Sequence, residues 1–330
     1  MFRPTLNWER VRGRVTLRDL HILAAVVHWG SMARGAAHLG LSQPSVSEAV
    51  AKLEAALCVR LLDRSPRGVE PTMFGRTLLR RAHVVFDELK QSIRDIEFLS
   101  DPGAGEVRIG CPESLSAGFV PAVIDRLSRR YPRVSVRVLT AQAGEQEFRE
   151  LRNRSVDLLI GRVFKPVSDD DVEVDALCED GFFVAAGSRT RWARRPTVTI
   201  AELLDEPWIL FPEDSVSGAY IAEAFRSLGL PLPRRALTSF SPHLRLHLVS
   251  QGRFLTMLHG SVLRFNAKQW SLKALRTDLL VPPMPIAIFT LKNRTLSPVV
   301  GLFIEQAREA AALMGQCSLK VRSYTKAPGG

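Results

Sequence analysis

Apolar residues recur at helical spacing in three stretches near the start of the chain, which begin near residues 16, 31 and 42. The first begins with the pattern of a capping box at Thr16. Gly40 separates the second stretch from the third and permits a sharp reversal that a side chain would hinder. In the third stretch, Val46, Val50 and Leu53 share one face. The pattern predicts two helices joined by a tight turn and supported by an earlier helix.

The start of the third stretch is polar. Ser42 can cap the helix, and Pro44 is tolerated there because the first amides of a helix have no helical partner. Short polar side chains and a cation at the start of a helix are suited to base edges and phosphates, so the two helices joined by a turn predict a DNA-reading helix-turn-helix. A helical hairpin with a polar surface is the alternative. The polar residues are Gln43, Ser45, Ser47 and Lys52.

Residues 63–71 have the pattern of a short hairpin wing. Pro66 and Gly68 bracket Arg67 in a turn, and Arg64 precedes them. A basic tip beside a recognition helix can lie along phosphates or enter a minor groove. The alternative is a solvated surface loop.

A long helix is predicted from Thr72 to about residue 100. Its apolar residues are spaced three, four, three, four and three apart, which is the heptad pattern of a helix that pairs with another helix. The stretch therefore predicts the helix through which two copies dimerise. The seam consists of Leu79, Ala82, Phe86, Leu89, Ile93 and Ile96.

The pattern changes after residues 101–105, whose Pro and Gly end the helix and mark a domain boundary. Beyond it, strands alternate with helices in two α/β units of about 100 residues each. Gly103 and Gly105 lack the spacing and the preceding strand of a dinucleotide fingerprint, so no cofactor is expected.

Charge and composition agree with a polyanion partner at the N-terminal end. The 330 residues carry a net charge of +11, and residues 1–86 hold 13 Lys and Arg against 6 Asp and Glu. No apolar run approaches the ~20 residues of a membrane helix. The basic residues 1–15 lack the apolar core of a secretory signal and are expected to form a short extension. We expect a cytoplasmic, nucleoid-associated protein without a membrane partner.

Catalysis and metal binding find little support in the residues. The four cysteines lie far apart without a CxxC pair, so neither a disulfide framework nor a zinc knuckle is expected. His243 and His247 have the i, i+4 spacing of metal ligands on a helix, but the glutamate of an HExxH motif is missing. We expect no catalytic residue and no metal site.

The segment from residue 30 to residue 64 resembles the helix-turn-helix of LysR-type transcriptional regulators. Cys58 departs from the glycine usual in that family at the end of the recognition helix, and Glu48 departs from a basic or amide residue. The matching residues are Gly30, Ser31, Ala36, Ala37, Leu39, the run Ser42-Gln43-Pro44-Ser45-Val46-Ser47, Leu53, Glu54, Leu57 and Arg64.

The resemblance implies an α+β multidomain protein with a winged helix-turn-helix over residues 16–72. The two helices of the motif would span about 31–52 and the wing 63–71. A linker and dimerisation helix would cover 72–100, and a two-lobed α/β domain 106–315, Rossmann-like and similar to periplasmic solute-binding proteins. Lobe one would comprise 106–163 and 280–315, lobe two 164–275, with crossovers after Val163 and near 275–282. The tail, 316–330, is expected to be loose.

The same resemblance implies double-stranded promoter DNA as a partner, a dimer or a dimer of dimers, and RNA polymerase as a further contact. Gln43 and Ser45 are expected to read base edges, while most of the other candidates hold the DNA backbone. The DNA-binding candidates are Ser31, Arg34, Ser42, Gln43, Pro44, Ser45, Ser47, Lys52, Arg64 and Arg67.

Ligands of open α/β sheets bind at the carboxyl ends of strands, near helix N-termini. In the family, this cleft holds a small-molecule effector. The stretch 159–163 resembles the branch that regulates sugar and aromatic-acid catabolism, and a cation at Arg162 would suit an anionic effector. Each serine could equally be an ordinary helix cap. The effector-binding candidates are Ser114, Ser116, Thr140, Arg162, Ser215, Ser241 and His259.

Two other classes of protein remain open at this stage. One is an architectural DNA-binding protein without ligand control. The other is a solute-binding α/β protein in which residues 1–100 only mediate dimerisation. A sequence-specific regulator controlled by an effector bound between two lobes agrees best with the residues.

Overall fold

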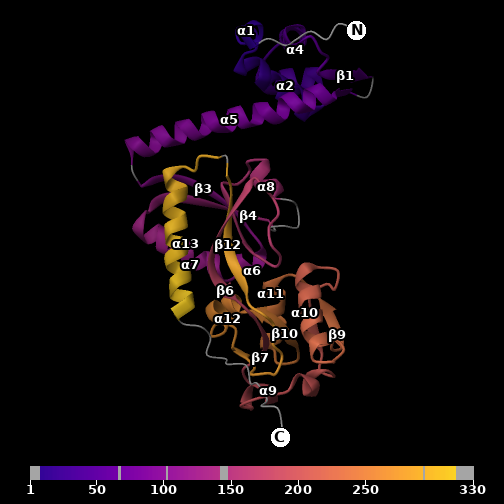
Figure 1. Cartoon of the computed structure of the whole chain (residues 1–330), viewed down its shortest axis with the longest axis vertical. Coiled ribbons are helices and arrows are strands. Elements are labelled where there is room, and N and C mark those ends of the chain that lie inside the picture. The colour runs from indigo at the N-terminus through magenta and orange to yellow at the C-terminus, as the bar shows by residue number, and fades with distance from the viewer. Residues whose placement is uncertain (1–7, 66–67, 102, 142–147, 293, 317–330) are drawn as a thin grey trace. The chain divides into compact units, whose positions relative to one another are not determined.

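A computed structural model describes residues 8–65, 68–101, 103–141, 148–292 and 294–316. The chain divides into two compact units, Met1–Ile93 and Arg94–Gly330 (Figure 1). None of the helices in the described ranges is long and apolar enough to cross a membrane.

The first unit consists of helices and one hairpin. The capping box predicted at Thr16 is confirmed, because its side chain accepts from the Asp19 amide while the Asp19 carboxylate accepts from the Thr16 amide. Ser42 caps its helix as predicted, and Ser31 caps the helix before it. The elements are α1 (Trp8–Val11), α2 (Leu17–Trp29), α3 (Met32–Leu39), α4 (Gln43–Leu57), β1 (Leu62–Ser65), β2 (Gly68–Pro71) and α5 (Met73–Ser100).

The turn after α4 keeps its shape without glycine. Cys58 adopts a left-handed conformation with φ 53°, a region that costs a side-chain-bearing residue about 1–2 kcal/mol. The carboxylate of Glu54 stabilises the exit from this turn, since it accepts from the amides of Leu61 and Leu62 at 2.7 and 3.2 Å. The turn at the end of α4 therefore forms although Cys58 stands where the family usually has glycine.

The wing consists of β1 and β2, paired antiparallel with Leu62 opposite Pro71 and Ser65 opposite Gly68. The Val69 amide donates to the carbonyl of Gly30 at 3.0 Å, which ties the second strand to the end of α2. The predicted tip residues, Pro66 and Arg67, lie outside the described residues.

The apolar seam of α5 divides into two halves. Leu79 and Ala82 are buried in the core of the first unit, so the interpretation that the whole seam faces another helix is wrong for this half. Further along, Leu89, Ile93 and Ile96 are 47%, 50% and 63% exposed. The heptad pattern therefore combines two different surfaces. The N-terminal half of the stripe packs in the core of the first unit, and the C-terminal half is exposed.

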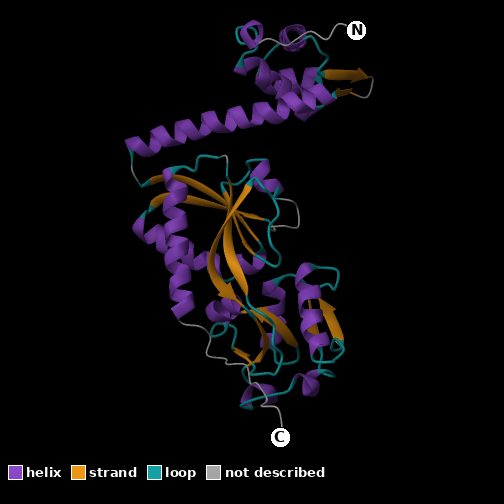
Figure 2. Ribbon diagram, in the orientation of Figure 1, coloured by secondary structure: helices purple, strands orange, loops and turns teal. Residues whose placement is uncertain are grey.

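The second unit contains two five-stranded sheets, with strand orders β4-β3-β5-β12-β6 and β11-β7-β10-β8-β9 (Figure 2). The first sheet contains β3 (Ala104–Cys111), β4 (Arg133–Thr140), β5 (Leu158–Arg162), β6 (Val172–Asp180) and β12 (Met284–Leu291). The second contains β7 (Phe182–Gly187), β8 (Trp208–Leu210), β9 (Arg235–Thr238), β10 (Leu255–His259) and β11 (Leu272–Ala274).

Helices cover both faces of each sheet, as parallel strands with buried faces require. On the first sheet, α7 and α13 pack against one face and α8 against the other (Figure 1). On the second, α9, η1 and α10 cover one face, α11 and α12 the other. The helices are α6 (Glu113–Ser116), α7 (Phe119–Arg130), α8 (Arg149–Arg152), α9 (Arg191–Arg194), η1 (Ile200–Leu203), α10 (Val216–Ser227), α11 (Pro242–Ser250), α12 (Gly260–Asn266) and α13 (Pro298–Gln316).

The first crossover differs from the prediction. The chain does not leave the first sheet after Val163, because β6 pairs antiparallel with β12 along its whole length, from Met284 opposite Asp180 to Leu291 opposite Val172. The crossing occurs between Asp180 and Phe182, and the assignment of 164–180 to lobe two is wrong. Strand β6 is an edge strand in which only the first and the last residue, Val172 and Asp180, are buried, and its alternating sequence contains no signal for which sheet it joins. The chain returns between β11 and β12, as expected.

Candidate functional site

The start of α4 is an exposed polar surface over an apolar base. The Ser42 hydroxyl accepts from the Ser45 amide at 3.3 Å and lies 2.8 Å from the Ser45 hydroxyl. Gln43 and Pro44 are exposed, and Ser47 is half-buried. Val46, one position on, is fully buried and holds this turn against the core. Capping therefore satisfies the first amides and leaves Gln43 uncovered at the tip.

Basic side chains accompany this helix start. Arg34, Lys52 and Arg64 are exposed, and none of them forms an ion pair with another residue in the described part of the chain. Ser31 is half-buried and caps α3, since its hydroxyl accepts from the Arg34 amide at 3.5 Å. Arg67 lies outside the described residues. The surface is a set of uncompensated cations beside short polar side chains, which suits a polyanion.

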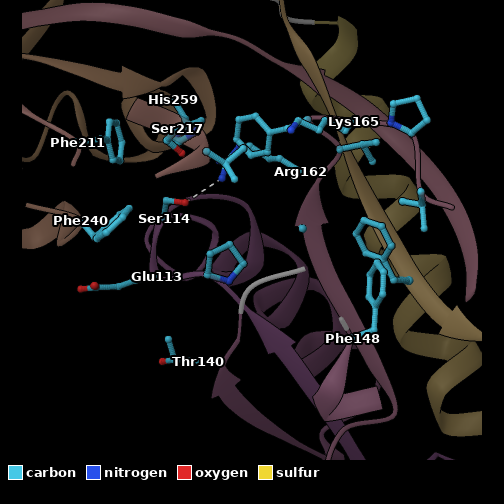
Figure 3. Close-up of a pocket in the computed structure, with 18 of the residues that line it drawn as sticks. Glu113, Ser114, Thr140, Phe148, Arg162, Lys165, Phe211, Ser217, Phe240 and His259 are labelled. Atoms are coloured by element: carbon cyan, nitrogen blue, oxygen red, sulfur yellow. Dashed lines mark hydrogen bonds between the residues drawn. The ribbon is translucent and has the colours of Figure 1, made fainter. Parts of the chain in front are cut away.

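A cavity of about 520 Å³ lies in the second unit, where the carboxyl ends of strands from both sheets meet. The first sheet contributes Glu113, Ser114 and Thr140, which follow or end β3 and β4 (Figure 3). The second contributes Phe211 and Phe240, just beyond β8 and β9. The remaining walls come from the end of β10, the start of α10, Phe289 of β12 and the segment from Gly161 to Asp169.

Four of the seven predicted effector residues line this cavity: Ser114, Thr140, Arg162 and His259. The other three form hydrogen bonds with other residues of the protein. Ser116 lies 3.1 Å from the Cys111 sulfur. Ser215 caps α10 and donates to the Pro212 carbonyl. Ser241 caps α11 and donates to Glu113 across the two lobes at 3.2 Å.

Arg162 is not the free cation that the sequence implied. It is buried, and its guanidinium donates twice to Asp180, at 3.0 and 2.8 Å from Nε and Nη2. It also donates to Ser114 at 2.8 Å (Figure 3). A further hydrogen bond from Nη2 goes to Ser261 of α12 at 3.1 Å. The charge is therefore compensated, and Arg162 joins the first sheet, the crossover and the second lobe in one network.

His259 presents a neutral imidazole to the cavity. The side chain is 4% exposed, and its Nε2 is buried without a hydrogen-bond partner among the described residues. Burial lowers the pKa of His259 well below its ordinary value, and the charges of Arg162 and Arg245 lower it further. The ring stacks on Phe182 with centroids 4.1 Å apart. A neutral imidazole can donate one hydrogen bond and accept another.

The aromatic lining and one lysine had no signal in the sequence. Lys165 is exposed and forms no ion pair within the described ranges. The phenylalanines come from five places in the chain, and only their position just after a strand could have marked Phe211 and Phe240 as candidates. The aromatic residues are Phe148, Phe164, Phe211, Phe240 and Phe289.

The predicted histidine pair is packed against an aromatic ring. His243 and His247 of α11 lie with their ring centroids 5.3 and 6.0 Å from that of Trp270. Among the described residues, no group of three or more histidine, cysteine or carboxylate side chains is placed to hold a metal ion.

Two family models match the chain. Residues 17–76 match the bacterial regulatory helix-turn-helix proteins of the LysR family, and residues 100–312 match the LysR substrate-binding domain. The chain belongs to the LysR family of bacterial transcriptional regulators. It is therefore a DNA-binding regulator with an effector-binding domain, and its family is one of transcriptional regulators.

Curated relatives align with this LysR-type regulator over most of its length. It is 29% identical over 328 residues to the regulator GbpR of Azospirillum brasilense, covering 98% of this chain and 92% of GbpR. It is 26% identical over 303 residues to TdcA of Escherichia coli K12, covering 90% and 94%.

Solved structures share the fold. The crystal structure of full-length CbnR in complex with its target DNA has a TM-score of 0.62 at 21% identity, covering 90% of this chain and 100% of CbnR. A full-length OxyR variant from Pseudomonas aeruginosa has a TM-score of 0.62 at 20% identity, covering 89% and 97%.

Proposed function

We propose that this LysR-type regulator reads its operator with the start of α4 and is controlled by a small organic anion in the cavity between the two sheets. Residues 16–72 would form the DNA-binding domain, 72–100 the dimerisation helix and 106–315 the effector domain. The cavity supports this assignment most directly. It lies at strand ends, where α/β sheets bind ligands, and hydroxyls, cations and aromatic rings line it.

The hydrogen-bond donors around the cavity support an anionic ligand. Among the described residues, the charged side chains that line it are those of Glu113, Arg162, Lys165 and Asp169. Asp180 compensates Arg162, and Arg152 pairs with Asp169. Lys165 therefore remains as a cation at the rim, opposite Glu113. Hydroxyls of Ser114, Thr140 and Ser217 supply donors for oxygen atoms of a ligand.

Effector binding would act by changing the arrangement of the lobes. Arg162, Glu113 and Ser241 connect the two lobes around the cavity, so a ligand there contacts both and favours the arrangement that it fits best. In a dimer or a dimer of dimers, this shift would change the spacing of the DNA-binding pairs and the contact with RNA polymerase. Because its partner is promoter DNA, the protein would act on the nucleoid in the cytoplasm.

We expect Gln43→Ala to relax recognition at one base step of the operator by about 1–3 kcal/mol, because an exposed amide at the tip of α4 is suited to a base edge. Lys52→Ala is the matched control. Its ammonium is suited to phosphate, so its loss should weaken binding on all sequences and lower the salt slope by about 1. Titration of a set of single-base operator variants at several salt concentrations measures both. Equal loss on every sequence in both variants contradicts this division.

We expect Ile93→Asp to dissociate the dimer. Ile93 lies in the middle of the exposed half of the α5 seam, where a partner helix would bury it, and a buried unpaired carboxylate is costly. Sedimentation velocity over a range of concentrations should show a dimer that is weakened at least a hundredfold. Arg81→Asp, exposed on the same helix at a heptad position away from the seam, should leave it intact. An unchanged dimer in Ile93→Asp would place the interface elsewhere.

The regulator function is tested by a footprint on the DNA upstream of this protein's own gene. A defined near-palindrome, lost in Gln43→Ala, is expected. Organic acids that raise the melting temperature of the full chain are then added, and at least one should change the extent of protection. Diffuse, salt-sensitive protection indifferent to Gln43 would favour an architectural protein. The absence of any DNA affinity at physiological salt would favour a solute-binding protein.

A further inference from the structure

Arg245 of α11 is a buried cation without a carboxylate partner. Its side chain is 2% exposed, and no ion pair or carboxylate hydrogen bond reaches it from the described residues. Nε and Nη2 donate to the Thr256 hydroxyl at 3.0 and 2.6 Å, and Nη2 also donates to the Met257 carbonyl at 2.6 Å. These acceptors are neutral, so they satisfy hydrogen bonds and leave the charge uncompensated.

The guanidinium stays protonated under physiological conditions. Burial lowers the pKa of Arg245 to about 9, which is still above neutral pH. An isolated buried charge destabilises a fold, and most proteins pair it with an opposite charge. Arg162 and Arg294 in the same unit follow that rule, since each pairs with a buried aspartate. Among the described residues Arg245 departs from it, and this departure makes a counter-charge supplied by a ligand favourable.

Arg245 lies directly behind the second-lobe wall of the cavity. Its Cζ lies 3.9 Å from the ring centroid of Phe211, which lines the cavity. The Phe211 ring contacts His259 edge-on with centroids 6.2 Å apart, and Figure 3 shows both residues on the same side of the cavity. The Thr256 hydroxyl holds the guanidinium in place, because it donates in turn to the Ile209 carbonyl at 2.7 Å.

The same wall contains an unused hydrogen-bonding atom. Nε2 of His259 is buried and has no partner within the described part of the chain, although the side chain lines the cavity. A buried polar nitrogen without a partner destabilises the fold unless a ligand satisfies it. The nitrogen and the uncompensated cation lie on the same wall.

We propose that this wall, formed by His259 and Phe211 with Arg245 behind them, is a carboxylate subsite of the effector cavity. The imidazole of His259 would donate to the carboxylate, and Arg245 would supply the counter-charge through a desolvated wall. Arg245 does not touch the ligand and acts as a charge-selecting residue. The apolar part of the acid would lie against Phe211 and Phe240. This inference rests on the proposed function and specifies which part of the cavity selects an acid.

Other parts of the cavity are less suited to the carboxylate. Asp180 already neutralises Arg162, and Glu113 lies near the start of α6, where it repels an anion. Lys165 is exposed, so water screens its charge. Charge interactions are stronger in a buried, low-dielectric wall, and Arg245 is the buried cation near the cavity whose charge no described residue compensates.

The test uses acetate and acetamide as a matched acid and amide on the full-length protein. The ring resonances of His259, assigned with a His259→Gln variant, are followed by NMR at fixed pH and ionic strength. We expect a saturable shift with acetate and none with acetamide. In Arg245→Met the affinity for acetate should fall at least tenfold, and in Arg245→Lys, which keeps the charge, most of it should return. If Arg245 had only a structural role, the protein would not bind acetate in preference to acetamide on account of its charge.

Three results would overturn the subsite: no saturable acetate shift in the wild type, an equal response to acetamide, or an unchanged acetate affinity in Arg245→Met. The first two need no variant of Arg245, so a failure of Arg245→Met to fold does not remove the test. A footprint that responds to an effector while acetate is inert would reject the subsite and leave the proposed function standing. Acetate binding without any effector-dependent footprint would support the subsite and reject the proposed function.

Discussion

Replacement of Asp180 by alanine is expected to lower the free energy of unfolding of the second unit by about 3–5 kcal/mol. Asp180 ends β6 at the crossover between the sheets, and its carboxylate accepts from Arg162 and from the amide and hydroxyl of Ser261, at 2.9 and 2.7 Å. Both members of the Arg162–Asp180 pair are at least 97% buried, with side-chain exposures of 3% and 2%.

The size of the effect comes from the charge that is left behind. Without Asp180, the Arg162 guanidinium stays in a desolvated site with only the hydroxyls of Ser114 and Ser261 as acceptors. An uncompensated buried charge costs more than the net contribution of the pair. A double variant, Arg162→Met with Asp180→Leu, should therefore recover much of the loss, since it removes both charges.

Chemical denaturation followed by tryptophan fluorescence measures this, because Trp208 is fully buried in the second unit. Asp205→Ala is the matched control, since Asp205 is exposed and pairs with no described residue, and its effect should stay within about 0.5 kcal/mol. A loss below 1 kcal/mol for Asp180→Ala, or a double variant less stable than either single one, would contradict the argument.

Replacement of Asp157 by asparagine should cost a similar amount, about 3–5 kcal/mol at neutral pH. Asp157 precedes β5 and is 3% exposed. Arg108 donates to it from its amide at 2.9 Å and from Nη2 at 2.6 Å, and Arg294 from Nη2 at 2.9 Å. Arg94 of α5 adds a longer contact at 3.6 Å. Asparagine keeps the shape and removes the charge that neutralises these guanidinium groups.

This contribution depends on pH in a defined direction. Burial acts to raise the pKa of Asp157, but the hydrogen bonds from Arg108 and then the charges of Arg108 and Arg294 outweigh it and hold the pKa below its ordinary value. A group whose pKa is depressed by folding stabilises the fold above its unfolded pKa, about 3.9, and loses that contribution as the pH falls through the folded pKa. The difference between wild type and Asp157→Asn should therefore be constant above about pH 5 and shrink below pH 4.

Urea denaturation of both proteins between pH 3 and pH 7 checks this. Asp125→Asn serves as the control, because Asp125 forms only an exposed pair with Arg129 on the surface of α7, which is worth little. A stability difference for Asp157→Asn that stays the same down to pH 3 would show that the carboxylate contributes through packing and not through its charge.

Local structure in the first unit could be predicted from particular residues. The capping box at Thr16, the caps at Ser31 and Ser42 and the buried stripe of Val46, Val50 and Leu53 are all present. Each of these depends on residues three or four positions apart, so a short window contains both partners. The exposed polar start of α4 follows in the same way, because burying one stripe of a helix leaves the opposite face uncovered.

The effector cavity was predictable only in part. The strand-end rule placed Ser114, Thr140, Arg162 and His259 on its lining, because that rule needs only the order of strands and helices. It could not separate these residues from helix caps such as Ser215 and Ser241, because both kinds of residue occur at helix N-termini. The phenylalanines of the lining have no common spacing.

By itself, therefore, the sequence determined the helix starts and stripes, the family and the exposed polar start of α4, because these depend on short-range patterns. Only the tertiary structure decided that β6 joins the first sheet, that Asp180 compensates Arg162 and that Arg245 is buried without a carboxylate behind Phe211. Compensation of a charge depends on residues that lie 18 positions away or more in the chain, and burial depends on elements that pack from both lobes. Neither property has a pattern along the sequence.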